Sequence, residues 1–193
     1  SLFELAARAK EMKQRGEIAE DLDTKTTTET PQAFPNGCHV AEVEIDRACR
    51  TATLTILGPD DDARDLGAGF WPLRLARELE DAILHLRVNE LAIGTFILRS
   101  AGDPVLVEGF DGLLYEHGGD WFLEEVALYW QRLLKRVDAT PRTIICLVEP
   151  GSCFVGFLAE LVLAADRSYM LDGTWPGQDV EAGMMLTSSS TGM

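Results

Sequence analysis

Residues 147–171, LVEPGSCFVGFLAELVLAADRSYML, decide how the chain folds. A β-type run at residues 143–148 leads into the turn signal Pro-Gly-Ser at residues 150–152. The segment after the turn, residues 154–165, is apolar on nearly every side. The pattern predicts a strand, a tight turn and a helix that is buried all round.

One acidic residue interrupts this apolar segment. Glu160 is the only charged residue between Glu149 and Asp166. An unpaired carboxylate inside a protein is costly. We therefore expect Glu160 to have a hydrogen-bonding partner, to be protonated, or to open onto a site.

The composition is that of a globular protein and limits the classes of partner. With 193 residues the chain has the length of one domain, and 46% of its residues are hydrophobic. The net charge of -15 argues against nucleic acid and against an anionic membrane surface as partners. No apolar stretch is long enough to span a bilayer, which also predicts no membrane association.

The first part of the chain predicts a helix and linker, followed by a domain. Residues 2–20 have a helical apolar period, and residues 21–37 are polar with two prolines. We therefore divide the chain into an N-terminal helix and linker, residues 1–37, and one domain, residues 38–193. Alternation through residues 40–57 predicts a β-hairpin at the start of that domain.

The middle of the chain alternates helices with strands. Residues 71–89 predict a helix with Glu78 on its polar side. Residues 91–98 are almost continuously apolar and predict a strand covered on both faces of a sheet. Asp120 predicts the cap of a second helix, whose inward stripe begins at Trp121. This order predicts an α/β fold.

The cysteines and histidines carry no recognisable metal or nucleophile pattern. The four cysteines, Cys38, Cys49, Cys146 and Cys153, lack metal-ligand spacing, and we expect no metal site. Two of them lie in apolar sequence and predict buried thiols, consistent with a reducing cytoplasm. His117 is expected to be a loop residue, because no serine or cysteine pattern accompanies it.

Several motifs in this order resemble the crotonase (enoyl-CoA hydratase/isomerase) superfamily. The run from Gly156 to Glu160, followed by Asp166, is similar to the family's turn, helix and catalytic acid. Within the superfamily the chain looks most like the benzoyl-CoA-dihydrodiol lyase family, specifically the second of its two crotonase-like halves. The short sequence segments on which this resemblance rests are EPGSCF (149–154), AEL (159–161), AADR (164–167), WPL (71–73) and NEL (89–91).

The resemblance implies a fold, an activity and a set of partners. It implies a crotonase-type spiral of ββα units, incomplete at its C-terminal side, so the chain is expected to be a piece of a longer polypeptide. It implies a lyase or hydrolase acting on an aromatic acyl-CoA thioester in the ring opening of aerobic benzoyl-CoA breakdown. It also implies a cytoplasmic homo-oligomer with no cofactor other than coenzyme A as part of the substrate.

The resemblance also implies the site residues. Glu160 would be the catalytic acid or base, and the backbone amides of Gly109 and Phe157 would form the oxyanion hole. Such amides stabilise the enolate oxygen of a thioester. Gly156, Leu158 and Ser188 would line the substrate pocket.

Two departures from the family pattern leave alternatives open. Phe157 and Leu158 are bulky where the family has glycines beside the acyl group. Ser188 falls where the family has its second catalytic Glu, while a less favoured register places Glu181 there. The alternatives are a non-catalytic structural or dimerisation half-domain, and a conventional enoyl-CoA hydratase or isomerase.

Overall fold

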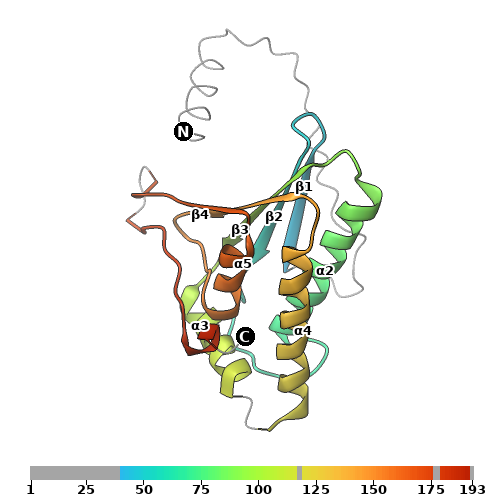
Figure 1. Cartoon of the computed structure of the whole chain (residues 1–193). Coiled ribbons are helices and arrows are strands. Elements are labelled where there is room, and N and C mark those ends of the chain that lie inside the picture. Colours follow the sequence, from blue (N-terminus) through green and yellow to red (C-terminus); the bar gives the residue numbers. More distant parts are fainter. Residues whose placement is uncertain (1–39, 117–118, 176–178, 192–193) are drawn as a thin grey trace.

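The computed structural model describes residues 40–116, 119–175 and 179–191. The predicted N-terminal helix and linker, residues 1–37, lie outside this range, and so does His117, so those predictions stay predictions. The elements run in the order β1 (Ala41–Asp46), β2 (Thr51–Leu57), α2 (Trp71–Asn89), β3 (Thr95–Ala101), α3 (Pro104–Glu116), α4 (Trp121–Asp138), β4 (Thr143–Val148), the 3-10 turn η1 (Gly156–Leu158), α5 (Ala159–Ala164), β5 (Arg167–Met170) and the 3-10 turn η2 (Ser188–Thr191) (Figure 1).

The strands form one sheet in sequence order, which confirms the α/β prediction. The sheet runs β1-β2-β3-β4-β5. The predicted hairpin is antiparallel, and β2 to β5 are parallel to one another. Strands β2, β3 and β4 are in register at their starts, because Thr95 pairs with both Thr51 and Thr143, and β5 starts opposite Ile145. The sheet therefore has one edge where the parallel strands begin and an opposite edge where they end.

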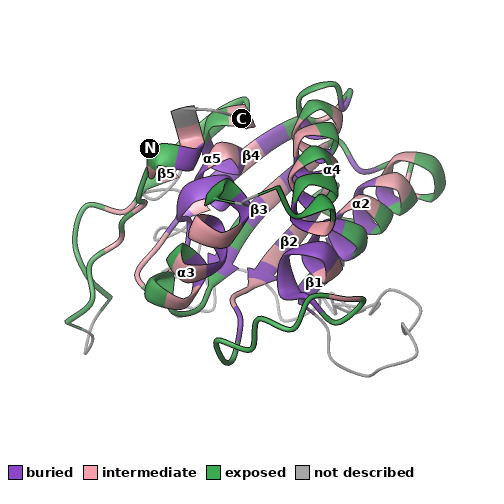
Figure 2. Ribbon diagram, turned by 90° about the horizontal axis from the view of Figure 1, so that it is seen from below, coloured by how far each residue is buried: buried purple, intermediate pink, exposed green. Residues whose placement is uncertain are grey.

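Burial alternates along the strands, so one face of the sheet is packed more tightly than the other. Ala52, Leu54 and Ile56 of β2 are fully buried, whereas the residues between them are partly exposed. Figure 2 shows the buried residues where the helices meet the sheet. The prediction for residues 91–98 was wrong in two respects: the strand begins at Thr95, and Leu91 is 72% exposed. The predicted strand began too early because the first residues of the apolar run form a loop before the strand.

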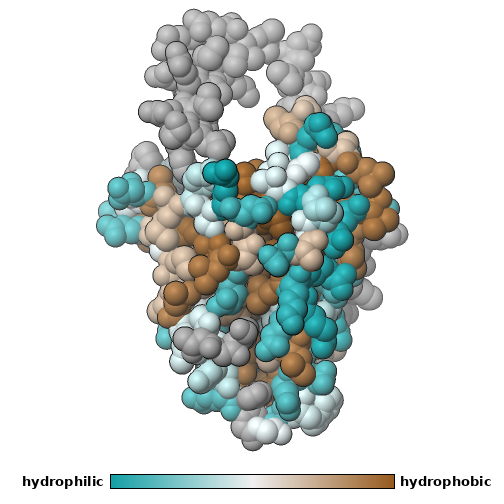
Figure 3. Space-filling view, in the orientation of Figure 1, coloured by the Kyte–Doolittle hydropathy of each residue, from teal (hydrophilic) through white to brown (hydrophobic). Residues whose placement is uncertain are grey.

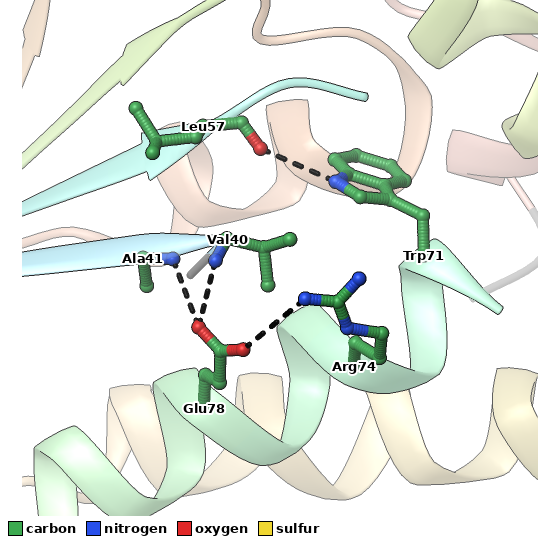
Figure 4. A network of polar contacts seen from close by, with 6 residues as sticks. All are labelled: Val40, Ala41, Leu57, Trp71, Arg74 and Glu78. Atoms are coloured by element: carbon green, nitrogen blue, oxygen red, sulfur yellow. Dashed lines mark hydrogen bonds and ion pairs between the residues drawn. The ribbon is translucent and has the colours of Figure 1, made fainter. Parts of the chain in front are cut away.

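Helix α2 is fastened to the first strand by a buried carboxylate. Oε2 of Glu78 accepts hydrogen bonds from the amides of Val40, at 2.8 Å, and Ala41, at 3.1 Å (Figure 4). Trp71, in the first turn of α2, donates through Nε1 to the carbonyl oxygen of Leu57 at 3.2 Å. Glu78 was predicted on the polar side of the helix, and it is instead buried, because those two amides at the start of β1 need an acceptor.

Helix α4 lies beside α2, α3 and α5 and closes the core (Figure 1). Its predicted cap is confirmed: Asp120 Oδ1 accepts from the amides of Phe122, at 2.8 Å, and Leu123, at 3.3 Å. Trp130 is completely buried, but Trp121, predicted to point inward, is 74% exposed. Trp121 is the first residue of the helix and lies beyond the part that packs on the core.

Candidate functional site

The site predicted from sequence starts at the turn after β4. The chain passes Gly151, at φ 85°, and reaches Gly156, at φ 53°, both in the left-handed region that glycine adopts readily. The segment between them is held by Met185, which donates to the Phe154 carbonyl oxygen at 2.9 Å and accepts from the Gly156 amide at 3.0 Å. The turn thus fixes the backbone that presents the next amide, that of Phe157.

The helix after the turn is shorter and less enclosed than the sequence predicts. It consists of the single turn η1 and the six-residue α5. Phe157 and Leu158 are fully buried, as expected, but Leu163 is 59% exposed, so the prediction of all-round burial was wrong there. The run of apolar residues includes one side of α5 that no described element covers.

The Phe157 amide, predicted to serve the oxyanion hole, donates to a carboxylate of the protein itself. Oδ1 of Asp111 accepts this amide at 2.9 Å and the Ser189 hydroxyl at 2.6 Å. Oδ2 of Asp111 accepts the Thr187 hydroxyl at 2.6 Å. Asp111 is only 2% exposed, and these three donors compensate the burial of its charge.

Gly156 makes room for this carboxylate. A Cβ atom built on Gly156 would lie 2.1 Å from Cγ of Asp111. The left-handed turn and the missing side chain therefore allow the Asp111 carboxylate to approach the backbone. The space next to the Phe157 amide, which the resemblance assigns to a thioester oxygen, contains a carboxylate oxygen.

Aromatic side chains fill the surroundings of Phe157. The ring centroid of Phe157 lies 4.6 Å from that of Trp130 and 6.0 Å from that of Trp71. Leu158, expected to line a substrate pocket, is fully buried as part of the same core. Neither residue lines either of the open hollows described below.

Gly109, whose amide was predicted to form part of the oxyanion hole, lies inside a helix. Helix α3 begins at Pro104, so Gly109 is its sixth residue. Only the first four amides of a helix lack an intrahelical partner. The Gly109 amide is therefore in a poor position to donate to a ligand. The guanidinium group of Arg64 also covers this position, because its Nη2 lies 2.8 Å from where a Cβ atom on Gly109 would be.

Glu160 opens onto a groove on the other side of α5. Its Oε1 is buried and has no hydrogen-bonding partner within the described residues. The groove, about 530 Å³ in volume, lies between α4 and α5 and is lined by Gln131, Leu134, Lys135, Asp138, Glu160, Leu163 and Ala164. Figure 3 shows apolar residues gathered over α5 beside hydrophilic residues of α4. The groove lining includes neither Asp111 nor Phe157.

The two candidate positions for a second catalytic acid, Ser188 and Glu181, lie in different parts of the structure. Ser188 begins the turn η2 and is exposed, while its neighbours Thr187 and Ser189 bind Asp111. Glu181 is exposed and precedes the bridge between Ala182 and Pro150. The structure thus places the Leu-Thr-Ser segment against the turn, where it contributes hydroxyl groups and no carboxylate.

Sequence reasoning missed Asp111, Thr187 and Ser189. The available signal was the same one that identified Glu160, because Asp111 is an acid in an otherwise apolar stretch that includes Phe110, Leu113 and Leu114. The two hydroxyl donors could not be found this way, since they are 76 and 78 residues from Asp111.

The remaining features of the described residues concern metal ligands and membrane spans. No group of three or more potential metal ligands occurs among the described residues. No helix in that part of the chain is both long and apolar enough to cross a bilayer.

Comparisons with known proteins agree with the sequence motifs. No protein-family model matches the chain. Benzoyl-CoA-dihydrodiol lyase of Aromatoleum evansii is 40% identical over an alignment of 178 residues, which covers 87% of this chain and 32% of the lyase. The chain therefore matches about a third of that protein's length.

Solved structures of enoyl-CoA hydratase type are similar to part of this chain. An enoyl-CoA hydratase/carnithine racemase from Magnetospirillum magneticum has a TM-score of 0.46 and 24% identity, covering 68% of this chain and 46% of its own. An enoyl-CoA hydratase from Bacillus halodurans has a TM-score of 0.47 and 18% identity, covering 67% and 49%. By its sequence, the chain is a relative of part of benzoyl-CoA-dihydrodiol lyase.

Proposed function

We propose that the chain is part of a CoA-thioester-transforming enzyme of the benzoyl-CoA-dihydrodiol lyase type. The identity of 40% over 178 residues supports this assignment. Such an enzyme opens the ring of an activated aromatic acyl-CoA, and its other parts and further copies of this chain would be the partners. Within it, this part serves as a supporting half that shapes or joins the catalytic region.

The hydrogen bond between the Phe157 amide and Asp111 carries the supporting role. An oxyanion hole works because preorganised N–H groups meet the negative charge that develops on the substrate oxygen. Here a carboxylate already accepts that N–H, and its own charge would repel an enolate oxygen. The donors on Asp111 and the rings around Phe157 make this arrangement part of the core.

Acid–base catalysis by Glu160 is the second candidate. The unpaired Oε1 of Glu160 and the open groove beside it favour this role. Lys135 lines the same groove and could attract an anionic substrate. For a thioester enolate to form at the Phe157 amide, Asp111 would first have to leave it. The Glu160 carboxylate would also have to reach a substrate bound on the other side of α5.

Calorimetric titration of the 193-residue chain with benzoyl-CoA and with coenzyme A separates the two candidates. We expect benzoyl-CoA to bind no more tightly than coenzyme A, because the acyl site is filled by protein side chains. Tighter binding of benzoyl-CoA than of coenzyme A would overturn the supporting role. In that case, loss of turnover in Glu160→Gln, with turnover kept in Asp138→Asn from the same groove, would establish Glu160 as the acid or base.

A further inference from the structure

A second hollow lies at the opposite edge of the sheet from Asp111. It has a volume of about 690 Å³ and is lined by residues at the starts of the parallel strands. Arg50 immediately precedes β2, Arg142 precedes β4, and Arg167 is the first residue of β5. Strands β2 and β4 begin level with each other, and Arg167 pairs with Ile145, two residues into β4. The three arginines therefore line one space although they are far apart in the sequence.

These arginines have no acidic partner in the described part of the chain. Within residues 40–116, 119–175 and 179–191, none of the three forms an ion pair, whereas Arg47, Arg99 and Arg136 each pair with a glutamate. The chain as a whole is acidic, with 32 acidic and 17 basic residues. Three unpaired guanidinium groups make this hollow locally positive on an acidic molecule.

The hydrogen bonds of the hollow leave much of the donor capacity unused. Arg142 donates through Nη1 to the Pro141 carbonyl oxygen at 2.9 Å, while its Nε is buried without a partner in the described chain. Arg50 donates through Nε to the Ala92 carbonyl oxygen at 2.8 Å. The one carboxylate in the lining, that of Asp166, accepts the Ile144 amide at 2.8 Å through Oδ2. A guanidinium group has five N–H donors, so most of those at this site remain available.

The backbone fixes Arg50 in place. Arg50 has φ 58°, a left-handed conformation that residues other than glycine rarely adopt. The amides of Gly94, at 2.9 Å, and Thr95, at 3.3 Å, both donate to the Arg50 carbonyl oxygen and hold this conformation. The backbone of Arg50 is therefore held rigidly, which lowers the entropic cost of binding a ligand.

We propose that this hollow binds a phosphoryl group, free or attached to a small organic molecule. Guanidinium forks match the oxygens of a phosphoryl group and form short, charge-assisted hydrogen bonds with them. The hollow is larger than phosphate needs, and the apolar residues Leu91, Ile93 and Pro141 in its lining offer a surface for an organic part. The site is independent of the acyl site, because it lies at the other end of the strands.

Titration of the 193-residue chain with inorganic phosphate and with ADP, at ionic strength held constant with NaCl, tests this proposal. Both ligands are expected to bind and to raise the melting temperature. Equal affinity would identify a site for the free anion, whereas tighter binding of ADP would identify a site for a phosphorylated organic molecule. Absence of binding by both ligands would overturn the proposal.

Two variants locate the binding. Arg167→Glu, at an exposed position of the hollow, should weaken phosphate binding at least about tenfold, as expected when a charged hydrogen-bond donor is lost. Arg132→Glu makes the same charge change on α4, outside the hollow, and should bind like the unchanged chain. Equal loss in both variants would show a general charge effect and overturn the site. Arg142→Lys keeps the positive charge but removes the two-pronged guanidinium group, and it should also weaken phosphate binding. Full phosphate affinity in both Arg142→Lys and Arg167→Glu would refute the proposed site.

Discussion

Asp111 and Glu160 are both acids within apolar sequence, and their surroundings give them different roles. Asp111 accepts one amide and two hydroxyl groups inside the core. Glu160 lies beside an open groove with one oxygen unpaired. The first arrangement stabilises the fold, and the second leaves a carboxylate available for other contacts. The number of donors around each acid, rather than the acid itself, makes the difference.

Replacing Asp111 tests how much its network stabilises the protein. Asp111→Ala should lower the free energy of unfolding by about 2–4 kcal/mol, because it leaves three buried donors unsatisfied and removes side-chain volume. Urea denaturation followed by circular dichroism measures the change. Asp62→Ala, in the exposed loop before α2, should change the stability by less than about 0.5 kcal/mol. Similar losses in the two variants would contradict the structural role of Asp111.

The cysteines should differ in reactivity according to burial and hydrogen bonding. Burial raises the pKa of Cys146 to about 12, so its thiol stays protonated and unreactive near neutral pH. Cys49 is exposed, and hydrogen bonding to the Asp46 carboxylate, with the negative charge of that group, raises its pKa. Asp46→Asn should lower the pKa of Cys49 and speed its alkylation at pH values near 8, since the thiolate is the reactive form.

Mass spectrometry after iodoacetamide treatment identifies which thiols react. In the folded chain Cys49 should be alkylated well before Cys146, and urea should remove this difference. Slower alkylation of Cys49 in Asp46→Asn would contradict the proposed hydrogen bond.

At the scale of elements, the turn between β4 and α5 depends on two glycines with different constraints. Gly151 and Gly156 both have positive φ angles, but a Cβ on Gly151 would meet nothing within 4 Å. A Cβ on Gly156 would overlap the Asp111 carboxylate. The same turn thus contains one position limited by backbone conformation and one limited by conformation and packing together.

This difference gives a matched pair of variants. Gly151→Ala should cost about 1 kcal/mol of stability from the left-handed backbone alone. Gly156→Ala should cost at least about 2 kcal/mol more, because the Asp111 network must also move. Chemical denaturation of the two variants measures both values. Equal costs would show that Asp111 does not press against Gly156.

At the scale of the whole molecule, charge rather than packing determines how the chain responds to salt. With a net charge of -15, the negative charges of the folded chain repel one another and lower its stability. Raising NaCl from about 0.01 M to about 0.15 M shortens the screening length from about 30 Å to about 8 Å. The melting temperature should therefore rise over this range.

Scanning calorimetry at the two salt concentrations tests this expectation. Choline chloride should give the same rise as NaCl, since screening does not depend on the cation. A melting temperature that falls with either salt would mean that attractive ion pairs, such as Arg99 with Glu149, outweigh the repulsion.

The sequence by itself determined the hairpin, helix α2, helix α4 with its cap at Asp120, and the turn before Gly156, but it did not predict helix α3 or strand β5. These features depend on local rules, namely apolar period, capping chemistry and the freedom of glycine, which act over a few neighbouring residues. The family motifs likewise lie in short continuous stretches. For these reasons the fold and the family could be predicted from the sequence.

Only the tertiary structure decided which group the Phe157 amide meets and which residues share a pocket. Asp111 reaches that amide from a helix 46 residues earlier in the chain, and three strand starts bring Arg50, Arg142 and Arg167 to one hollow. Neither arrangement leaves a periodic or local mark in the sequence. Each arises from the way the sheet and helices pack, because packing brings together groups that chain neighbours do not specify.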